Sequence, residues 1–429
     1  MGTNLTRTPA SAVTAERRKF TYSCWIKKCE NGKTYFLLSG NRAGSSYTYL
    51  IFQTDNSIRF RLYDGGNRAD IQASDLFQDT ASWYHVVLQF DSTQSTSSDR
   101  VKIYINNRQL TDLQSSTYPS QDYQSWINHN SEQGIMEGGD GTCYIAEIHQ
   151  TGGQIYAPST FGETDSTTGE WKPKSVSGIT YGTNGFYLKF ANAGAMGTDS
   201  SGNSNNFTVN SAGTNPQTVD TPSNLFCTFN FLSKASNVTL SEGDLKATIA
   251  GAGQSRSTVG TIAVSKGKWY WEVKYTTDQV SAFIGLVSAD IGWNINTTSY
   301  PSSSVSDNVG FNDGGTKYVN GSSSSYGSGF GNNDVIGVAA NLDDNEVIFY
   351  VNGTAQNSGT AISKTFSGDY YPVVQHQSST GTSNFQINFG NPSFTISSGN
   401  ADAAGFGNFE YAVPSGHFAL CTRNLNTYG

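Results

Sequence analysis

Charged residues and long apolar stretches are both scarce in this chain of 429 residues. Asp, Glu, Lys and Arg make up 14% of it, and the formal net charge is −8. No segment approaches the roughly 20 apolar residues that cross a bilayer, and no run of Lys or Arg locally reverses the negative charge. We therefore expect neither membrane insertion nor binding to nucleic acid.

Cysteine and histidine are also few, and their spacing excludes several kinds of site. The five cysteines, Cys24, Cys29, Cys143, Cys227 and Cys421, are odd in number and form no CxxC pair, which argues against a disulfide framework and a zinc ribbon. The histidines form no HExxH motif. We expect reduced cysteines, no metal site and no cofactor. The first twenty residues lack the apolar region of a signal peptide, so we expect synthesis in a cytoplasm.

Aromatic residues and glycines are plentiful, at 13% of the chain and 46 residues. They occur in short runs in which apolar and polar residues alternate, as in strands with one buried face. The runs of the first half are 20–28, 34–40, 47–53, 57–64, 82–91, 101–107 and 143–150, and those of the second half are 244–250, 260–276, 281–289, 308–313, 334–343, 346–353, 370–375 and 384–390. We therefore predict an all-β protein of two antiparallel β-sandwiches of jelly-roll type.

A segment rich in Gly, Ser, Thr and Asn separates the two sets of strands. Its only strand-like stretch is GFYLKFA at 185–191. We predict a first domain over residues 1–161, an extended connector over 162–224, and a second domain with a C-terminal extension over 225–429.

One hairpin pattern occurs in both domains. The stretches VKIYINN (101–107) and VIFYVNG (347–353) place apolar residues at every second position and end in Asn-Asn or Asn-Gly. These pairs favour the positive φ angles of a tight β-turn. The repetition is equally consistent with common architecture and with convergence on a good hairpin sequence.

The second domain resembles SPRY domains. The phrases GKWYWEV (267–273), AFIGLVSAD (282–290), DVIGVAANLDDNEVIFYVNG (334–353), YYPVV (370–374) and INFG (387–390) come in the order seen in that family. The resemblance covers about 225–390 and implies a bent antiparallel sandwich that binds partners, usually proteins, through loops at one end, without a catalytic centre.

The first domain resembles a laminin G or concanavalin A-like lectin sandwich, through FTYSCWIKK (20–28), ASWYHVVLQFD (81–91) and VKIYINNRQL (101–110). The phrases over 144–174, 181–194, 199–210 and 219–232 also resemble virion proteins of tailed bacteriophages, particularly phages of marine bacteria. In those proteins a laminin G-like domain precedes the same connector and often a SPRY-like domain.

A catalytic site is not apparent in the sequence. A concanavalin A-like glycosidase would need two carboxylates on one strand face, and no Glu-x-Asp-x-x-Glu run exists. Asp343 and Asp344 lie in a turn pattern, and Glu272 lies on a strand where the resemblance implies packing. We therefore predict no catalytic residues. Calcium ligation by loop carboxylates such as Asp64, Asp140 and Asp165 is conceivable, but no EF-hand pattern occurs and we do not predict it.

Aromatic side chains in polar loops are the candidate binding residues, because they give a large contact area at low entropic cost. Packing against the core or against a neighbouring subunit would explain the same residues. The candidates are Tyr118, Tyr123 and Trp126 of the first domain, and Trp293, Tyr300, Tyr318 and Tyr326 of the second.

From the phage resemblance we expect a non-enzymatic virion surface protein, made in the host cytoplasm. Its expected role is that of a tail-fibre or receptor-binding adhesion component that recognises a host cell-surface glycan or protein. The alternative is a head or tail decoration protein whose sandwiches bind neighbouring virion subunits, and a minor alternative is a polysaccharide-degrading enzyme. Expected partners are other virion proteins and further copies of the chain, as a homo-oligomer in the particle.

Overall fold

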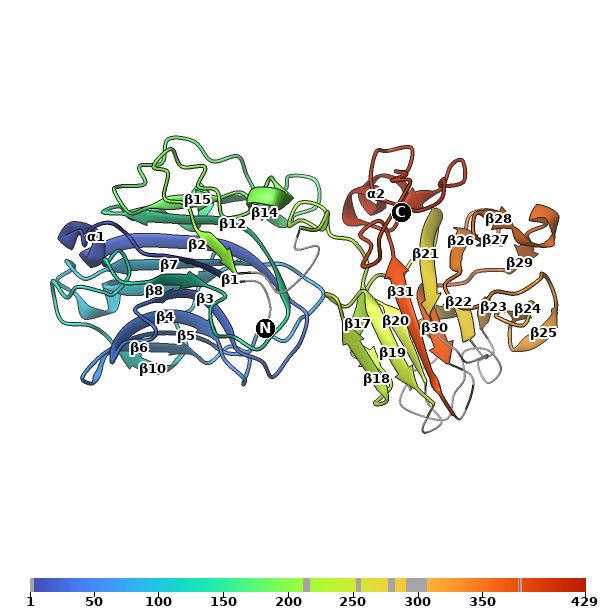
Figure 1. Cartoon of the computed structure of the whole chain (residues 1–429), viewed down its shortest axis with the longest axis horizontal. Coiled ribbons are helices and arrows are strands. Elements are labelled where there is room, and N and C mark those ends of the chain that lie inside the picture. Colours follow the sequence, from blue (N-terminus) through green and yellow to red (C-terminus); the bar gives the residue numbers. More distant parts are fainter. Residues whose placement is uncertain are drawn as a thin grey trace. The chain divides into compact units, whose positions relative to one another are not determined.

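The chain forms two compact units, Met1–Ser223 (unit 1) and Asn224–Gly429 (unit 2), in a computed structural model (Figure 1). The model describes residues 4–210, 217–251, 256–276, 282–290, 307–376, 378 and 380–429. Helices in these ranges are short: α1 (Thr14–Arg18), α2 (Thr422–Tyr428), and the 3-10 turns η1 (Ser97–Asp99), η2 (Pro158–Thr160), η3 (Ala193–Ala195) and η4 (Gln356–Gly359). The prediction of an all-β protein with antiparallel β-sandwiches is confirmed.

Unit 1 consists of two large sheets packed face to face, with one small hairpin beside them. The eight-stranded sheet runs in the order β10 (Leu113–Thr117), β6 (Asn67–Ala73), β5 (Ile58–Asp64), β4 (Ser46–Phe52), β3 (Tyr35–Gly40), β11 (Gln133–Ile135), β1 (Asn4–Arg7) and β16 (Thr208–Asn210). The six-stranded sheet runs β15 (Phe186–Leu188), β12 (Cys143–Gly152), β2 (Lys19–Lys28), β7 (Tyr84–Asp91), β8 (Val101–Ile105) and β9 (Arg108–Gln109). The hairpin is β13 (Gly162–Thr164) with β14 (Trp171–Pro173). Their inner faces form one core that includes Phe20, Phe60 and Leu88.

Unit 2 is a second sandwich with its own core. Its seven-stranded sheet runs β17 (Phe229–Lys234), β20 (Ser257–Gly260), β30 (Tyr370–His376), β22 (Ala282–Ser288), β23 (Asn308–Asn312), β24 (Thr316–Val319) and β25 (Ser322–Ser325). The nine-stranded sheet runs β18 (Val238–Ser241), β19 (Lys246–Ala250), β31 (Thr382–Asn388), β21 (Lys268–Thr276), β26 (Val335–Asn341), β27 (Glu346–Val351) and β28 (Thr354–Ala355), with β29 (Ile362–Ser363) on β27 and β32 (Phe418–Ala419) on β21. Trp269, Trp271 and Phe385 lie in the core between these sheets.

The repeated hairpin is the same structure in both units. Asn106 and Asn107 follow β8 with φ of 48° and 67°, and Asn352 and Gly353 follow β27 with φ of 48° and 77°. In unit 1 the Asn106 amide oxygen accepts a hydrogen bond from the backbone N–H of His85, at 2.7 Å. In unit 2 the Asn352 amide oxygen accepts one from the backbone N–H of the first residue of β26, at 3.0 Å. Each Asn therefore closes its turn and joins it to the preceding strand.

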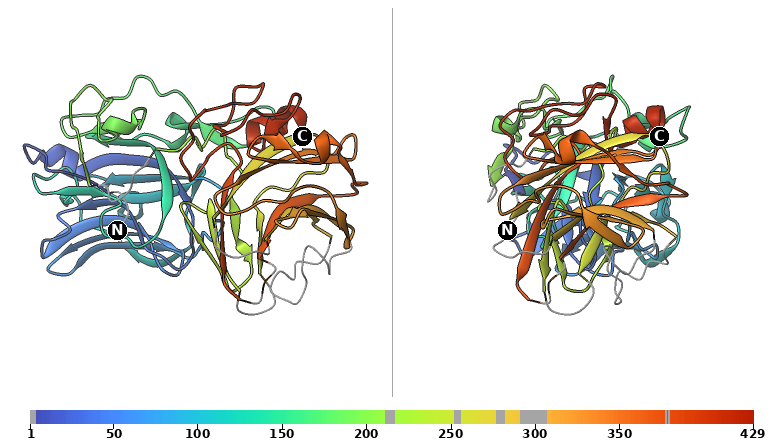
Figure 2. Two further views of the ribbon diagram at one scale, coloured as in Figure 1. Left: turned by 45° about the vertical axis from the view of Figure 1, so that its right-hand side comes forward. Right: turned by 90° about the vertical axis from the view of Figure 1, so that its right-hand side faces the viewer.

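The segment 162–224, which we expected to be an extended connector, is largely built into unit 1. Its strand β15 pairs with β12, and β16 pairs with β1. The division between the units falls between Ser223 and Asn224. The physical reason is that the six-stranded sheet has apolar and aromatic side chains on its outer face as well. The chain from β13 to β15, drawn in green in Figures 1 and 2, lies along that face and covers it. We call residues 153–210 and 217–223 the covering segment of unit 1.

The C-terminal segment has a similar role in unit 2. Residues 390–429, drawn in red, lie against the β21 side of the nine-stranded sheet (Figure 2). Phe409, Ala419 and Cys421 pack there on Tyr270 and Ala339 as a second, smaller apolar cluster. One sheet of each sandwich is thus covered on its outer face by chain that shows little strand alternation in the sequence, with GFYLKFA (185–191) as the exception.

Candidate binding face

The outer face of the eight-stranded sheet in unit 1 combines aromatic and polar side chains. Along β5 the buried residues Ile58, Phe60 and Leu62 alternate with the half-buried Arg59, Arg61 and Tyr63. Strand geometry places the second set together on the side away from the core. The outward positions of β4 are Tyr47 and Tyr49, which lie directly opposite Tyr63 and Arg61 in the register.

Four aromatic rings follow one another across β3, β4 and β5. The ring of Tyr63 stacks on that of Tyr47, with 5.3 Å between centroids, and Tyr47 stacks on Tyr49 at 5.5 Å. Phe36 meets Tyr49 edge-on at 5.6 Å. We call Phe36, Tyr49, Tyr47 and Tyr63 the tyrosine row. The row ends on a guanidinium at both sides, with Arg42 4.9 Å from the centroid of Phe36 and Arg61 5.6 Å from that of Tyr63, as in cation–π contacts.

The three phenol groups of the row differ from the other tyrosines of unit 1. Most of those, such as Tyr22, donate a hydrogen bond from the hydroxyl to a protein acceptor. Among the described residues, the hydroxyls of Tyr47, Tyr49 and Tyr63 have no hydrogen-bond partner. The tyrosine row therefore offers three donor and acceptor groups beside half-exposed aromatic surface.

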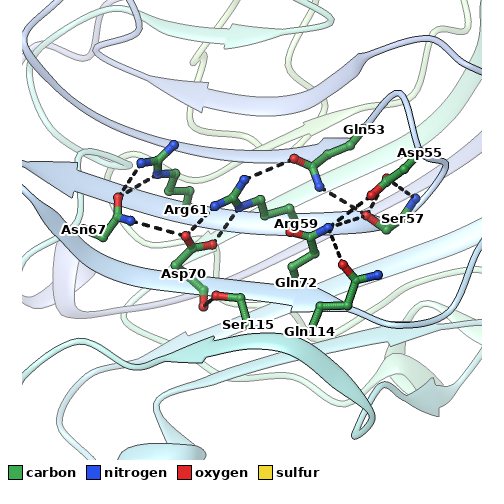
Figure 3. Close-up of polar contacts among 10 residues, drawn as sticks. All are labelled: Gln53, Asp55, Ser57, Arg59, Arg61, Asn67, Asp70, Gln72, Gln114 and Ser115. Carbon is green, nitrogen blue, oxygen red and sulfur yellow. Dashed lines mark hydrogen bonds and ion pairs between the residues drawn. The ribbon is translucent and has the colours of Figure 1, made fainter.

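A network of polar side chains continues the face across β5, β6 and β10 (Figure 3). At its centre Arg59 forms a two-point contact with Asp70, at 2.6 and 2.5 Å. This hydrogen bonding raises the pKa of Arg59 above its ordinary value. The Gln72 amide donates to Gln114 at 3.1 Å. The ten residues drawn are Gln53, Asp55, Ser57, Arg59, Arg61, Asn67, Asp70, Gln72, Gln114 and Ser115. We call them the polar network, and the network and the tyrosine row together the candidate face.

Arg61 differs from Arg59 in the charge of its partner. Its Nε and Nη2 donate to one neutral acceptor, the amide oxygen of Asn67, at 2.8 and 2.6 Å. No carboxylate of the described residues lies within 4.0 Å of its guanidinium. Asp70, opposite Arg61 in the register, is already bound by Arg59. The candidate face therefore contains one guanidinium without an ion-pair partner, between Tyr49 and Tyr63.

The aromatic residues that we predicted for the first domain lie in the chain between β10 and β11. Tyr118 and Tyr123 are half-buried and pack on the core, and the Tyr123 hydroxyl donates to Asp64 at 2.6 Å. Trp126 is also half-buried, with His129 edge-on at 4.6 Å and Arg17 over its ring at 5.8 Å. Two contacts join this segment to strands of the candidate face: the Tyr123 hydroxyl binds Asp64, the last residue of β5, and the Trp126 backbone N–H donates to Thr48 of β4 at 3.0 Å.

The predicted residues of the second domain are divided. Tyr326 is a correction: it is 6% exposed, packs in the core against Phe311 and Phe349, and donates its hydroxyl to the Thr360 carbonyl at 3.0 Å. Tyr318 is half-buried and packs edge-on against Phe283. Trp293 and Tyr300 lie outside the described residues.

The two buried histidines of the six-stranded sheet are held neutral by their surroundings. The His85 ring stacks on Trp25 at 4.6 Å and accepts from Trp171 Nε1 on Nδ1 at 3.0 Å. Since an indole nitrogen only donates, the His85 proton lies on Nε2 and is donated to Ser23 Oγ, at 2.8 Å. Burial lowers the pKa of His85 and that of His149 to about 3. Both histidines bind side chains of the covering segment. His85 binds Trp171, and His149 Nδ1 lies 2.8 Å from the Tyr181 hydroxyl.

The carboxylates considered for chemistry have structural contacts. Glu272 is buried, and its oxygens accept from the backbone N–H groups of Glu410 and Tyr411 at 2.9 and 2.8 Å. Burial raises the pKa of Glu272. Asp343 accepts from the backbone N–H of Gly267, and the Asp344 N–H is bound within the β26–β27 turn. Across the part of the chain that is described, no three His, Cys, Asp or Glu side chains gather in a way that could hold a metal ion.

Each carboxylate considered as a calcium ligand has hydrogen-bond or ion-pair partners within the protein. Asp64 accepts from Ser46 and Tyr123, Asp140 accepts from the backbone N–H of Thr34, and Asp165 binds Lys172 at 2.6 Å.

No helix of the described ranges has the length and apolarity to cross a membrane.

The sequence analysis did not predict the candidate face, because its candidate residues were aromatic side chains in loops and the face lies on strands. The signal was present in YTYLIF (47–52) and IRFRLY (58–63), where Tyr and Arg occupy the positions that alternate with the buried residues. Outward positions of a strand are usually occupied by polar residues of no particular function, so the pattern alone does not distinguish a binding face.

Fold and face together define a two-unit β-sandwich protein with a lectin-like first half. Comparison with protein families agrees: residues 2–135 match the model described as the concanavalin A-like lectin/glucanases superfamily, and residues 268–392 match the SPRY domain. The predicted domain content, a laminin G or concanavalin A-like domain followed by a SPRY domain, is therefore confirmed. A search of curated proteins finds no match.

Three solved structures are similar to part of this chain, and two of them are named as SPRY domains. The SPRY domain of human HERC1 is 18% identical, with 37% of this chain and 96% of that chain covered and a TM-score of 0.32. The PSpry domain of TRIM65 is 16% identical, with coverages of 37% and 87% and a TM-score of 0.30. Stonustoxin is 18% identical with a TM-score of 0.30, and the match covers 38% of this chain but only 27% of the stonustoxin chain.

Proposed function

We propose that the chain is a non-enzymatic adhesion protein on the surface of a phage virion, where it binds a glycan or protein of the host cell. The observation that carries the proposal is the candidate face, which places a fixed polar network and three phenol groups, without a hydrogen-bond partner in the described part of the chain, on a lectin-like sandwich. The virion assignment rests on the sequence phrases of 144–232. Other virion proteins and further copies of the chain are the proposed partners within the particle.

Preorganisation supports binding by this face. The side chains of the polar network hold one another through hydrogen bonds, as between Arg59 and Asp70, so little rotamer entropy is lost when a ligand binds. Tyrosine adds contact area with few rotatable bonds. Weak binding by one copy would be strengthened by the several copies of a virion.

The non-enzymatic part of the proposal is supported by the contacts of the acid and base candidates. Glu272, His85 and His149 are buried and hold covering segments in place. Asp343 fixes a turn. A polysaccharide-degrading activity would require a pair of carboxylates at about 5 to 10 Å around a bound sugar, and these side chains are committed elsewhere.

Binding of labelled protein to host cells tests the adhesion proposal. We expect saturable binding that falls strongly when Tyr49 is replaced by alanine, with Tyr428→Ala in the exposed C-terminal helix as the control. Trp126→Ala tests the sequence-predicted loop in the same assay. An absence of cell binding by protein that is normally incorporated into virions would favour the second candidate, a decoration protein that binds neighbouring subunits.

The virion assignment has its own test. Mass spectrometry of purified phage particles should detect this chain in several copies per particle. Particles that contain all other structural proteins but lack this chain would contradict the assignment and leave the binding proposal to be judged alone.

A further inference from the structure

We infer that the candidate face takes an acidic polysaccharide and that Arg61 binds a uronate carboxylate of the polymer. The inference rests on the proposed adhesion function and names the chemistry of its ligand. It begins from the contrast between the two arginines of β5. Arg59 is neutralised by Asp70 in a two-point contact, whereas the one acceptor of Arg61 among the described residues is the neutral Asn67.

The geometry of Arg61 leaves part of its guanidinium for a ligand. Nε and Nη2 both donate to the Asn67 amide oxygen, so the side chain is held in one orientation. Nη1 has no partner among the described residues. The guanidinium also lies over the ring of Tyr63, with Cζ 5.6 Å from the centroid, as in a cation–π contact. A guanidinium fixed in this way binds a carboxylate through short, charge-assisted hydrogen bonds.

Apart from Asp55, whose carboxylate accepts from Ser57 and Gln72, the rest of the face suits the uncharged parts of a sugar. Hydroxyl groups of a pyranose can pair with the phenol groups of Tyr47, Tyr49 and Tyr63, which have no partner in the described part of the chain. The C–H surface of the sugar can pack on the half-exposed rings. Beyond Arg61, the amide groups of Gln72 and Gln114 supply donors and acceptors already held in place.

The face is longer than one sugar. The tyrosine row crosses three strands, and the polar network continues over β6 to the edge strand β10. Neighbouring strands lie about 4.8 Å apart, so the five strands from β3 to β10 span about 19 Å. An extended polymer with a carboxylate on its repeating unit matches this length better than a single monosaccharide.

The closing experiment compares polymers that differ only in charge. Binding of the full chain is measured for alginate and polygalacturonate and for their methyl-esterified forms, which keep the backbone and lose the carboxylate. We expect the acidic forms to bind at least tenfold more tightly, and added NaCl to weaken them because it screens the charge.

Variants of unit 1 give the residue-level test. Arg61→Gln should weaken binding to the acidic polymers by roughly ten- to one-hundredfold, and Arg61→Lys should restore part of the loss because it retains the charge without the planar fork. Arg108→Gln removes a charge from the other sheet, where Arg108 pairs with Asp75, and should leave binding unchanged. Circular dichroism and melting temperature confirm that each variant is folded.

The outcomes separate this inference from the proposed function. Equal binding of acidic and esterified polymers, or an unchanged affinity of Arg61→Gln, overturns the acidic ligand while glycan adhesion stands. Binding to cells without binding to any of the polymers also overturns it. If Arg61→Gln instead alters only the association of the chain with itself, the face is an interface between copies. If neither polymers nor cells are bound, the proposed function fails as well.

Discussion

The ion pair between Lys27 and Asp220 lies deep within unit 1. Nζ and Oδ2 are 2.7 Å apart, and the two side chains are 1% and 0% exposed. Trp83 donates its indole N–H to the second oxygen of Asp220 at 2.9 Å, and Lys27 lies over the ring of Tyr144. This contact holds residue 220, near the end of the covering segment, against the central strand β2.

Removing one partner of this pair should be costly. Asp220→Ala leaves a buried ammonium without its counter-charge, and we expect unit 1 to lose about 3–5 kcal/mol of unfolding free energy. Urea unfolding monitored by fluorescence measures the loss. The matched control is Asp75→Ala, which breaks the exposed pair with Arg108 and should cost less than about 1 kcal/mol. Equal losses for the two variants would contradict the role assigned to Asp220.

The buried histidines predict how the stability of unit 1 depends on pH. Their folded pKa of about 3 lies below the 6.5 of an exposed histidine, because burial disfavours the charged ring. The unfolded chain therefore binds more protons as the pH falls below 6.5. Stability should be complete above that pH and should decrease by about 1.4 kcal/mol per histidine for each pH unit down to about 3.

Urea midpoints between pH 7 and pH 4 test this dependence. His85→Gln keeps a group that can donate and accept but cannot be protonated, so the variant should show a shallower decrease than the native protein. A decrease of the same steepness would show that His85 does not contribute.

Among the elements, the two covering segments show best what the sequence could and could not predict. Strands such as β2 and β5 were predictable because apolar and polar residues alternate along them, although β2 is buried on both faces, and the Asn-Gly turn after β27 followed from its φ requirement. Most of the segments over 153–210, 217–223 and 390–429 was not, apart from GFYLKFA (185–191), which contains β15, since their other contacts are single side chains such as Trp171 and Phe409 rather than a periodic face. Their placement depends on partners distant in sequence, which no local pattern encodes.

Glu272 provides a test of how the C-terminal segment is attached. Its carboxylate accepts from the backbone N–H groups of Glu410 and Tyr411 and from the Asn388 amide. In Glu272→Gln one acceptor is replaced by a donor that faces these N–H groups. Hydrogen exchange at residues 410 and 411 should then become at least about tenfold faster. Glu346→Gln, at the exposed first position of β27 in the same sheet, should leave that exchange unchanged, and protection retained in Glu272→Gln would argue against this anchor.

At the scale of the whole molecule, each unit has a large core made only of its own residues. We predict that fragments 1–223 and 224–429 fold separately, whereas a fragment that ends at residue 161 does not fold stably. The shorter fragment lacks β15, Trp171 and Asp220, and would expose the outer side of the six-stranded sheet, including His85 and Lys27.

Expression of the fragments gives the measurement. Fragment 1–223 should be soluble and unfold in one cooperative transition, and fragment 1–161 should aggregate or lack such a transition. A cooperative transition of the shorter fragment at the same temperature would show that the covering segment is dispensable.

The position of Asp220 also has a mechanical consequence. When force is applied to the chain where it leaves unit 1, at residue 223, the force reaches Asp220 three residues earlier. It then passes through Lys27 into β2. Because β2 has β12 on one side and β7 on the other, the tension would be shared by two neighbouring strands instead of peeling one strand from a sheet edge. In the proposed adhesion role, the protein would carry this kind of force between a particle and a moving cell. The force would enter unit 1 at the middle of a sheet and not at its edge.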